Sequence, residues 1–464
     1  MEKSQLSSDV VTSKRKSRSS NIELLRIIAM FMIIACHTAH GGIDKVSIDT
    51  VANTAFSHAF RSFGQVGVAL FIIISGYFGC KNRFRTLSMV KMIAQVCFYI
   101  LTTFIFVSIF HNSFPNAAGL ATVYNFLNNF TFVTNNYWFV MAYILFYGFS
   151  PFISRMVSNI TKKQFLFLLT IMFSAMSVVP LLNGKIISSA EITEVFGFWL
   201  FMYLIGCYIR LYPQDFSHRW IAFGIFTACF IIYLLSLVMP IKNGLPKPWF
   251  IQLRNNPILI IMSTCLFTTF KNINMKEVKV INVIAGSTFG VYLLHESYFM
   301  RFAIWKDIFH IAEHINDKNY WLYAIMATAI VFAVGIVVDL IRKYCLESPL
   351  FKVISNKGKP LFDKIDAFMP QTQFTEQEDK ECRSFWLHIM AIIVCLTVTR
   401  QLRYTNVEFF VRCNTLTFYL LIFMFEAIFF AITHMIKLKS KKKLLSTEGN
   451  DHAGVTISKM AEEK

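Results

Sequence analysis

Long apolar runs alternate with short polar and often basic segments along this chain of 464 residues. About ten of the runs reach the length of roughly 18 residues that a helix needs to cross a bilayer. They occupy residues 22–39, 64–80, 89–110, 137–154, 164–182, 195–212, 220–239, 257–271, 280–299 and 321–342. A soluble core would leave so many uncharged runs unexplained. The pattern therefore predicts an all-α, polytopic membrane protein.

Two further apolar runs, 384–399 and 415–436, follow a polar stretch. We therefore expect a ten-helix transmembrane core plus two C-terminal transmembrane helices. The predicted parts are a disordered cytoplasmic tail (1–20), the ten-span core (21–346), a cytoplasmic connector (347–383), the additional helix pair (384–436) and a basic, then polar cytoplasmic tail (437–464).

The chain is strongly basic, with 45 Lys and Arg against 27 Asp and Glu and a formal net charge of +18. The basic residues form short clusters at the ends of apolar runs, which argues against nucleic-acid binding. When the spans alternate from a cytoplasmic N-terminus, most clusters fall inside, although Lys242, Lys247 and Arg254 fall outside. This bias predicts a multi-pass protein of the cell membrane, with both termini cytoplasmic and with contacts to anionic lipid.

Two ionisable residues, Arg26 and His37, interrupt the first apolar run. A charged side chain inside a membrane span is energetically costly and by default marks function. Eleven helical steps make about three turns, so both residues fall on nearly the same helix face, roughly 16 Å apart along the axis. One helix is therefore expected to carry a guanidinium near one membrane boundary and an imidazole towards the other.

Several motifs follow one another in a characteristic order. The chain has Asn21-Ile22-Glu23-Leu24-Leu25-Arg26, then ten residues and His37, followed by Gly67 to Tyr77 with an internal Ser75-Gly76, Tyr137-Trp138-Phe139, Ser287 to His295, and Glu347-Ser348-Pro349. This ordered set resembles the acyltransferase-3 family of integral-membrane O-acyltransferases, over roughly residues 20–350. Arg-x10-His alone is a weak signal, whereas the ordered set on a ten-span core is fairly specific.

The resemblance implies an enzyme that moves an acyl group from cytoplasmic acyl-CoA to a hydroxyl of a cell-surface polysaccharide or lipid-linked glycan. It implies that His37 is the catalytic residue and that Arg26 is its motif partner. We expect acetyl-CoA as the donor substrate, O-acetylation in the cell envelope, and no permanently bound cofactor. No C-x-x-C pair occurs among the ten cysteines, and we expect neither a disulfide framework nor a metal site.

The chemistry of the two residues fits these roles. An alcohol is a poor nucleophile until a base removes its proton, and a neutral imidazole is such a base. Arg26 carries a planar guanidinium with five N–H groups. It therefore either binds the acyl-CoA donor or pairs with Glu23 one turn away. In the alternative, Arg26 reaches the cytoplasmic head groups and His37 only caps the outer end of the helix.

Other positions carry weaker signals for substrate binding. Ser75 would supply an acyl-site hydroxyl, although a Ser-Gly pair in a membrane helix is more typical of close packing. Tyr137 and Trp138 either contact the acceptor or form an interfacial aromatic anchor. His295 and Glu296 either bind the acceptor sugar or are solvated residues at a helix end.

A basic group follows the second predicted span. Lys81, Arg83 and Arg85 either bind CoA phosphates at the cytoplasmic mouth or only set the topology. Members of the acyltransferase-3 family often carry Arg-x-x-Arg at this place, whereas this chain has Arg83-Phe84-Arg85.

Two other classes of protein remain open. Roughly twelve spans with both ends inside also suit a glycan exporter, although a carrier built from two halves should show related halves and matching broken helices. A structural membrane subunit is the third possibility. A role for the additional helix pair in recruiting polysaccharide assembly proteins as partners also stays open.

Overall fold

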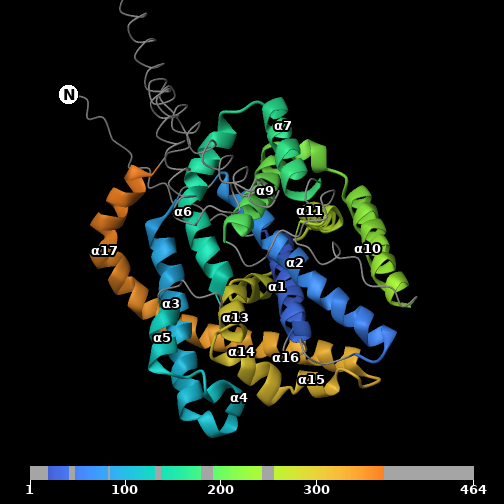
Figure 1. The fold of residues 1–464 in the computed structure, drawn as a ribbon. Helices are drawn as coiled ribbons and strands as arrows, with labels where there is room; N and C mark the ends of the chain where they lie inside the picture. Colours follow the sequence, from blue (N-terminus) through green and yellow to red (C-terminus); the bar gives the residue numbers. More distant parts are fainter. Residues whose placement is uncertain are drawn as a thin grey trace, which may run out of the picture. The chain divides into compact units, whose positions relative to one another are not determined.

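The computed structural model describes residues 19–40, 48–81, 84–130, 137–178, 192–242 and 255–369 (Figure 1). All of them belong to one unit, Met1–Thr372, and a second unit comprises Gln373–Lys464. The predicted helix pair 384–436 and the C-terminal tail lie outside the described residues, as does most of the N-terminal tail.

The described residues form helices joined by short turns, and no strand occurs among them, which confirms the predicted all-α class. The helices are α1 (Ser20–His40), α2 (Val51–Gly79), α3 (Thr86–Ile109), α4 (Pro115–Ala118), α5 (Val123–Phe130), α6 (Trp138–Ser158), α7 (Lys162–Phe173), α9 (Ile192–Leu211), α10 (Arg219–Lys242), α11 (Pro257–Lys271), α12 (Lys279–Ala285), α13 (Thr288–His295), α14 (Met300–Phe302), α15 (Ile311–His314), α16 (Tyr320–Ile341) and α17 (Ser348–Phe368). Short 3₁₀ turns occur at His111–Ser113 and Pro213–Phe216, and π-helical turns occur at Ser174–Val178, Ala303–Ile308 and Arg342–Glu347.

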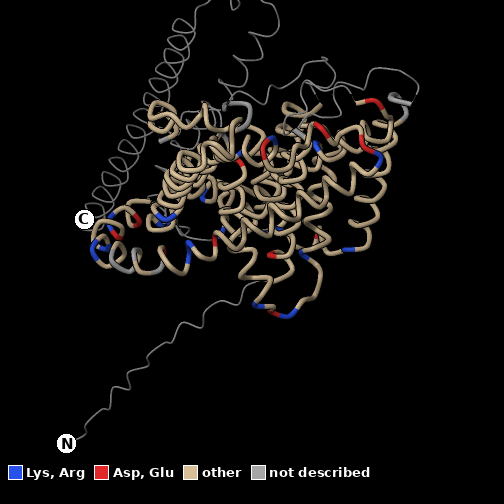
Figure 2. The backbone as a smooth tube through the Cα atoms, turned by 90° about the horizontal axis from the view of Figure 1, so that it is seen from below, with Lys and Arg blue, Asp and Glu red and all other residues tan. Residues whose placement is uncertain are grey.

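Six of the described helical segments are long and apolar enough to cross a membrane: Ser20–Ala39, Val51–Gly79, Thr86–Ile109, Phe139–Ser158, Arg219–Val238 and Tyr320–Glu347. Two shorter apolar helices occupy Phe196–Leu211 and Pro257–Lys271. Charged positions are sparse along most of the backbone in Figure 2, whereas Lys and Asp recur along α17. The chain is therefore a multi-pass membrane protein, and the predicted total of twelve spans remains a prediction.

The first helix, α1, packs against α2, α11, α12, α13 and α16 (Figure 1). Its first turn is tied to the segment between α11 and α12, because the Asn21 amide donates to the carbonyls of Phe270, Lys271 and Ile273 at 2.9–3.2 Å. Near its other end, the Thr38 hydroxyl lies 3.0 Å from that of Thr328 in α16. Polar contacts at both ends therefore hold α1 against its neighbours.

The second helix begins earlier than the apolar pattern predicts, at Val51 instead of residue 64. The Thr50 hydroxyl accepts a hydrogen bond from the backbone N–H of Asn53 and caps this end of the helix. The Asn53 amide donates to the carbonyls of Ile315 and Asp317 at 2.8 and 3.0 Å. The predicted boundary is wrong because polar residues of this helix are buried against another segment, which a hydropathy pattern cannot show.

The predicted single span 280–299 is also wrong, because α12 ends at Ala285 and α13 begins at Thr288. Shortly after this break in the sequence, Gly290 of α13 lies against Asp339 of α16. A Cβ at Gly290 would overlap the Asp339 carboxylate. One oxygen of Asp339 accepts from Gln95, Tyr99 and Arg342 at 2.9–3.1 Å. This buried polar cluster joins α3, α13 and α16.

Two glycines allow α2 and α9 to cross at backbone contact. A Cβ at Gly206 would overlap the Ile73 carbonyl, and a Cβ at Gly76 would overlap the Tyr203 carbonyl. Close approach at small residues is a usual means of helix association in membranes. Gly76 therefore serves packing, which is one of the two roles that its Ser-Gly motif allowed.

We expect Gly206→Ala to lower the midpoint of thermal unfolding in detergent by roughly 2–8 °C, because overpacking costs about 1–3 kcal/mol. Gly224→Ala in α10 is the matched control, since a Cβ there meets nothing within 4 Å. Equal unfolding midpoints for the two variants would contradict the proposed crossing.

Candidate active site

Two imidazole rings meet near the C-terminal ends of α1 and α13. Nδ1 of His37 lies 2.9 Å from Nε2 of His295, and the ring centroids are 5.1 Å apart. The sequence predicted these histidines in separate roles, one as catalytic and one as substrate-binding. The structure brings them into direct contact.

The hydrogen bonds of His295 indicate which nitrogen of each ring carries a proton. Nδ1 of His295 lies 2.6 Å from the Val291 carbonyl, which can only accept. Nδ1 is therefore the donor, and Nε2 of a neutral His295 ring is an acceptor. His37 must then donate from Nδ1, so the lone pair of a neutral His37 ring lies on Nε2. This assignment rests on the hydrogen-bond partners of both rings.

Glu296 follows His295 at the end of α13, and its Oε1 lies 3.3 Å from Nδ1 of His37. A carboxylate there favours a proton on Nδ1 and stabilises the imidazolium that forms when Nε2 takes up a second proton. The side chain of His37 is 22% exposed, whereas His295 is fully buried. His37 is therefore the ring that a substrate can reach.

The same three residues could hold a metal ion, because their ligand atoms all lie within 4.8 Å of one another. In a tetrahedral zinc site with bonds of about 2.0–2.1 Å, neighbouring ligand nitrogens lie roughly 3.4 Å apart. The 2.9 Å between the two rings fits a direct hydrogen bond better than a shared metal. The expected absence of a metal stays a prediction.

Tyr137 immediately precedes α6 and is buried. Its hydroxyl donates to the Leu293 carbonyl of α13 at 2.7 Å, and its ring centroid lies 6.4 Å from that of Tyr292. Tyr292 in turn meets His295 edge-on at 5.9 Å. These contacts support a role for Tyr137 in holding α13 beside His37. The side chain of Trp138 lies outside the described residues.

Arg26 lies on the same continuous helix as His37. Its Nη1 is 3.3 Å from each carboxylate oxygen of Glu23, so the pairing that the sequence left open is present. The guanidinium carbon also lies 5.8 Å from the centroid of the Phe78 ring. The Arg26 side chain remains 30% exposed, which leaves it accessible to a ligand.

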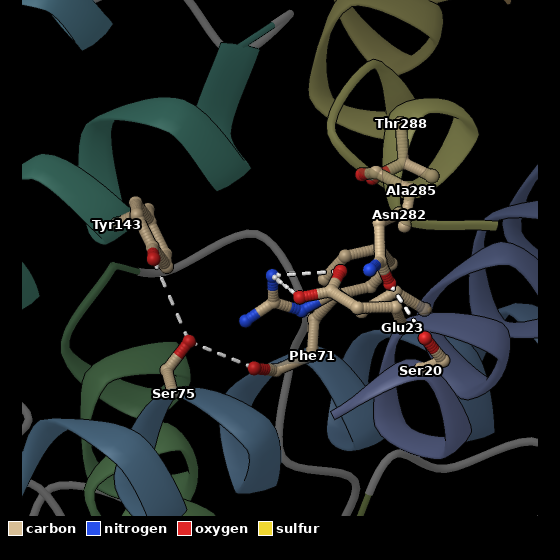
Figure 3. Close-up of polar contacts among 9 residues, drawn as sticks. Ser20, Glu23, Phe71, Ser75, Tyr143, Asn282, Ala285 and Thr288 are labelled. Carbon is tan, nitrogen blue, oxygen red and sulfur yellow. Dashed lines mark hydrogen bonds and ion pairs between the residues drawn. The ribbon is translucent and has the colours of Figure 1, made fainter. Parts of the chain in front are cut away.

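Small polar side chains lie around the Glu23 carboxylate (Figure 3). On one side, the Ser20 hydroxyl donates to Asn282 at 3.0 Å. On the other, the Ser75 hydroxyl donates to the Phe71 carbonyl at 2.8 Å and lies 3.5 Å from the Tyr143 hydroxyl. Ser75 is therefore part of a polar layer to which α1, α2, α6 and α12 contribute.

The basic group predicted to bind the donor lies between α2 and α3. Lys81 and Arg85 are exposed, and Arg83 lies outside the described residues. The Tyr147 hydroxyl lies 3.4 Å from the backbone N–H of Arg85 and 3.3 Å from its carbonyl. The role of Lys81, Arg83 and Arg85 in binding CoA phosphates remains a prediction.

The acyltransferase-3 family model, described as an acyltransferase domain, matches residues 19–340. This chain therefore belongs to the acyltransferase-3 family, which confirms the resemblance seen in its motifs. It is a membrane acyltransferase, a transferase that acts on groups other than aminoacyl groups. Searches among curated proteins and among solved structures give no match.

Sequence reasoning missed two features of the site. The contact between His37 and His295 joins residues that are 258 positions apart, and no local pattern predicts it. The fully buried Asp339 had a usable signal, because an acidic residue inside an apolar run marks a buried partner or a function.

We expect Tyr137→Phe to lower the unfolding midpoint, because it leaves the Leu293 carbonyl without its donor at a cost of about 1–3 kcal/mol. Tyr124→Phe in α5 is the matched control, since Tyr124 is 73% exposed. An unchanged midpoint together with a raised KM for the acceptor would instead indicate direct acceptor contact.

We expect exhaustive treatment with EDTA to leave acyl transfer unchanged, because the 2.9 Å between the two rings fits a hydrogen bond better than a shared metal. Metal analysis of the purified protein should then find less than one zinc per chain. Stoichiometric zinc, with activity lost in EDTA and restored by added zinc, would contradict this account.

Proposed function

We propose that this membrane acyltransferase moves an acetyl group from cytoplasmic acetyl-CoA to a hydroxyl of a cell-surface polysaccharide or lipid-linked glycan. The observation that carries the proposal is the contact of His37 with His295 and Glu296 inside the family-matched domain. Acyl transfer to an alcohol needs a base. This cluster supplies an imidazole whose lone pair lies on Nε2.

In the proposed reaction, Nε2 of His37 takes the proton from the acceptor hydroxyl as the hydroxyl oxygen attacks the thioester carbonyl carbon. The tetrahedral intermediate then breaks its carbon–sulfur bond. The departing CoA thiolate takes the proton back from the His37 imidazolium, so the products are a glycan ester and the CoA thiol. His295 keeps the His37 ring oriented, and Glu296 stabilises the imidazolium.

The donor is proposed to approach from the Arg26 end of α1 and the acceptor from the His37 end. Arg26 and the polar side chains around Glu23 support this, because they provide polar partners at the N-terminal end of α1 (Figure 3). This orientation requires the N-terminus on the cytoplasmic side, as the basic clusters predict.

The rival interpretation as a glycan exporter gains no support from the family match or from the described residues. A break in one helix, between α12 and α13, does not by itself indicate a carrier, because a carrier built from repeats should break matching helices in both halves. The helix that follows the break packs Gly290 directly against Asp339 of α16.

The direct test uses the purified protein in lipid nanodiscs with radiolabelled acetyl-CoA and a glycan acceptor. We expect His37→Ala to reduce kcat by about 100-fold or more, because a positioned general base contributes roughly that factor. His111→Ala is the matched control, since His111 is exposed in the turn after α3, and it should keep the wild-type rate.

Wild-type transfer that persists in His37→Ala would exclude His37 as the base. Glycan movement across the membrane without acetylation would favour the exporter. If rapid quenching traps an acetyl group on His37, the acetyl group is relayed through the histidine, and direct transfer with His37 as the base is excluded.

A further inference from the structure

Two cations lie at the C-terminal ends of two helices that both pack against α2, and they form no ion pair with a described residue. Arg210 is in the last turn of α9, and Lys271 is the last residue of α11. The Asn21 amide donates to the Lys271 carbonyl at 3.1 Å. Lys271 therefore lies at the same end of the domain as the first turn of α1, the end from which the donor is proposed to enter.

The guanidinium of Arg210 is held in a fixed orientation. Its Nη1 donates to the Tyr77 hydroxyl at 3.0 Å, and its central carbon lies 4.8 Å from the centroid of the Tyr77 ring. The Tyr77 ring packs in turn on Phe267 at 5.3 Å. The crossing of α2 and α9 at Gly76 and Gly206 brings Tyr77 and Arg210 to this position.

One donor of this guanidinium lacks an acceptor among the described residues. Nε of Arg210 is buried, and no described residue accepts a hydrogen bond from it. A buried charged donor without an acceptor is costly, since its desolvation is not compensated. The uncompensated Nε therefore favours an acceptor from outside the described part of the chain, such as a bound anion.

The nearby carboxylate is already engaged. Asp215 follows α9, and its oxygens accept from Lys162 at 2.8 Å and from the Tyr208 hydroxyl at 2.7 Å. Arg210 lies over the Tyr77 ring, and that ring packs on Phe267, about one helical turn before Lys271. The ends of α9 and α11 thus carry an excess of positive charge that favours an anion with more than one negative group.

We propose that Arg210 and Lys271 bind phosphate groups of the thioester donor. A guanidinium matches two phosphate oxygens with its planar fork, and an ammonium contributes a compact charge. This inference rests on the proposed function, because it requires a donor that carries phosphates. It places the phosphate contacts on α9 and α11, in addition to the exposed group between α2 and α3.

Helix-end stabilisation and lipid binding are the alternative roles for Arg210 and Lys271. Cations complement the C-terminal ends of helices, and an anionic lipid head group offers the same phosphate chemistry as the donor. If the two cations only stabilise helix ends, their substitution should lower the unfolding midpoint and leave the Kd of CoA unchanged. If they bind lipid, their effect on stability should depend on the lipid composition. The test therefore measures donor affinity and varies the lipid.

The experiment measures the Kd of CoA by calorimetry, with the full-length protein in nanodiscs of phosphatidylcholine. We expect Arg210→Gln and Lys271→Gln each to weaken CoA binding by about tenfold, as for a lost hydrogen bond to a charged group. For Arg210→Lys, the Kd of CoA should lie between those of the wild type and Arg210→Gln, because lysine keeps the positive charge but lacks the planar set of guanidinium donors. Lys163→Gln is the matched control, since Lys163 is an exposed cation at the start of α7.

An unchanged Kd in both glutamine variants, with wild-type unfolding midpoints, would overturn the inference. Stabilisation by phosphatidylglycerol that disappears in Arg210→Gln, without a change in the Kd of CoA, would assign the site to lipid and also overturn it. Wild-type protein that binds no CoA would refute the proposed donor as well, which separates failure of the function from failure of this site.

Discussion

The hydrogen bond between His37 and His295 joins the first helix of the domain to α13, and the proposed chemistry depends on it. His295 is fixed by the Val291 carbonyl and by the edge of Tyr292. The helix that carries it is fixed by the Tyr137 hydroxyl at one point and by the fit of Gly290 against Asp339 at another. Because the ring cannot turn without breaking these contacts, it fixes the orientation of His37.

The placement of the other polar side chains of α1 reflects the free-energy cost of burying polar groups in a membrane protein. Its polar side chains gather in two layers, one around Glu23 and Arg26 and one around His37 and Thr38, and each side chain has a partner on a neighbouring helix or one turn away. Apolar residues fill the interval between the layers. One helix thus carries a guanidinium near one end and an imidazole near the other, as the proposed reaction requires.

The sequence predicted the apolar helices well, because their length and composition are set by the bilayer. The predicted spans 257–271 and 321–342 agree with α11 and α16 to within about a residue. The pairing of Glu23 with Arg26 was also predictable, since residues three apart share a helix face. The start of α2, the break before α13 and the contact of His37 with His295 were not, because each depends on a partner distant in sequence. No pattern in the sequence distinguishes Arg210 and Lys271 from the other cations at the ends of apolar runs.

The proposed chemistry requires a neutral His37 that carries its proton on Nδ1 and its lone pair on Nε2. Nitrogen-15 NMR of histidine-labelled protein in nanodiscs tests it most directly, with the His37 signals assigned by their loss in His37→Gln. We expect a protonated Nδ1 and an unprotonated Nε2 at a pH where the ring is neutral. A neutral ring protonated on Nε2 would contradict the account, because the nitrogen assigned to the acceptor hydroxyl would then have no lone pair to offer.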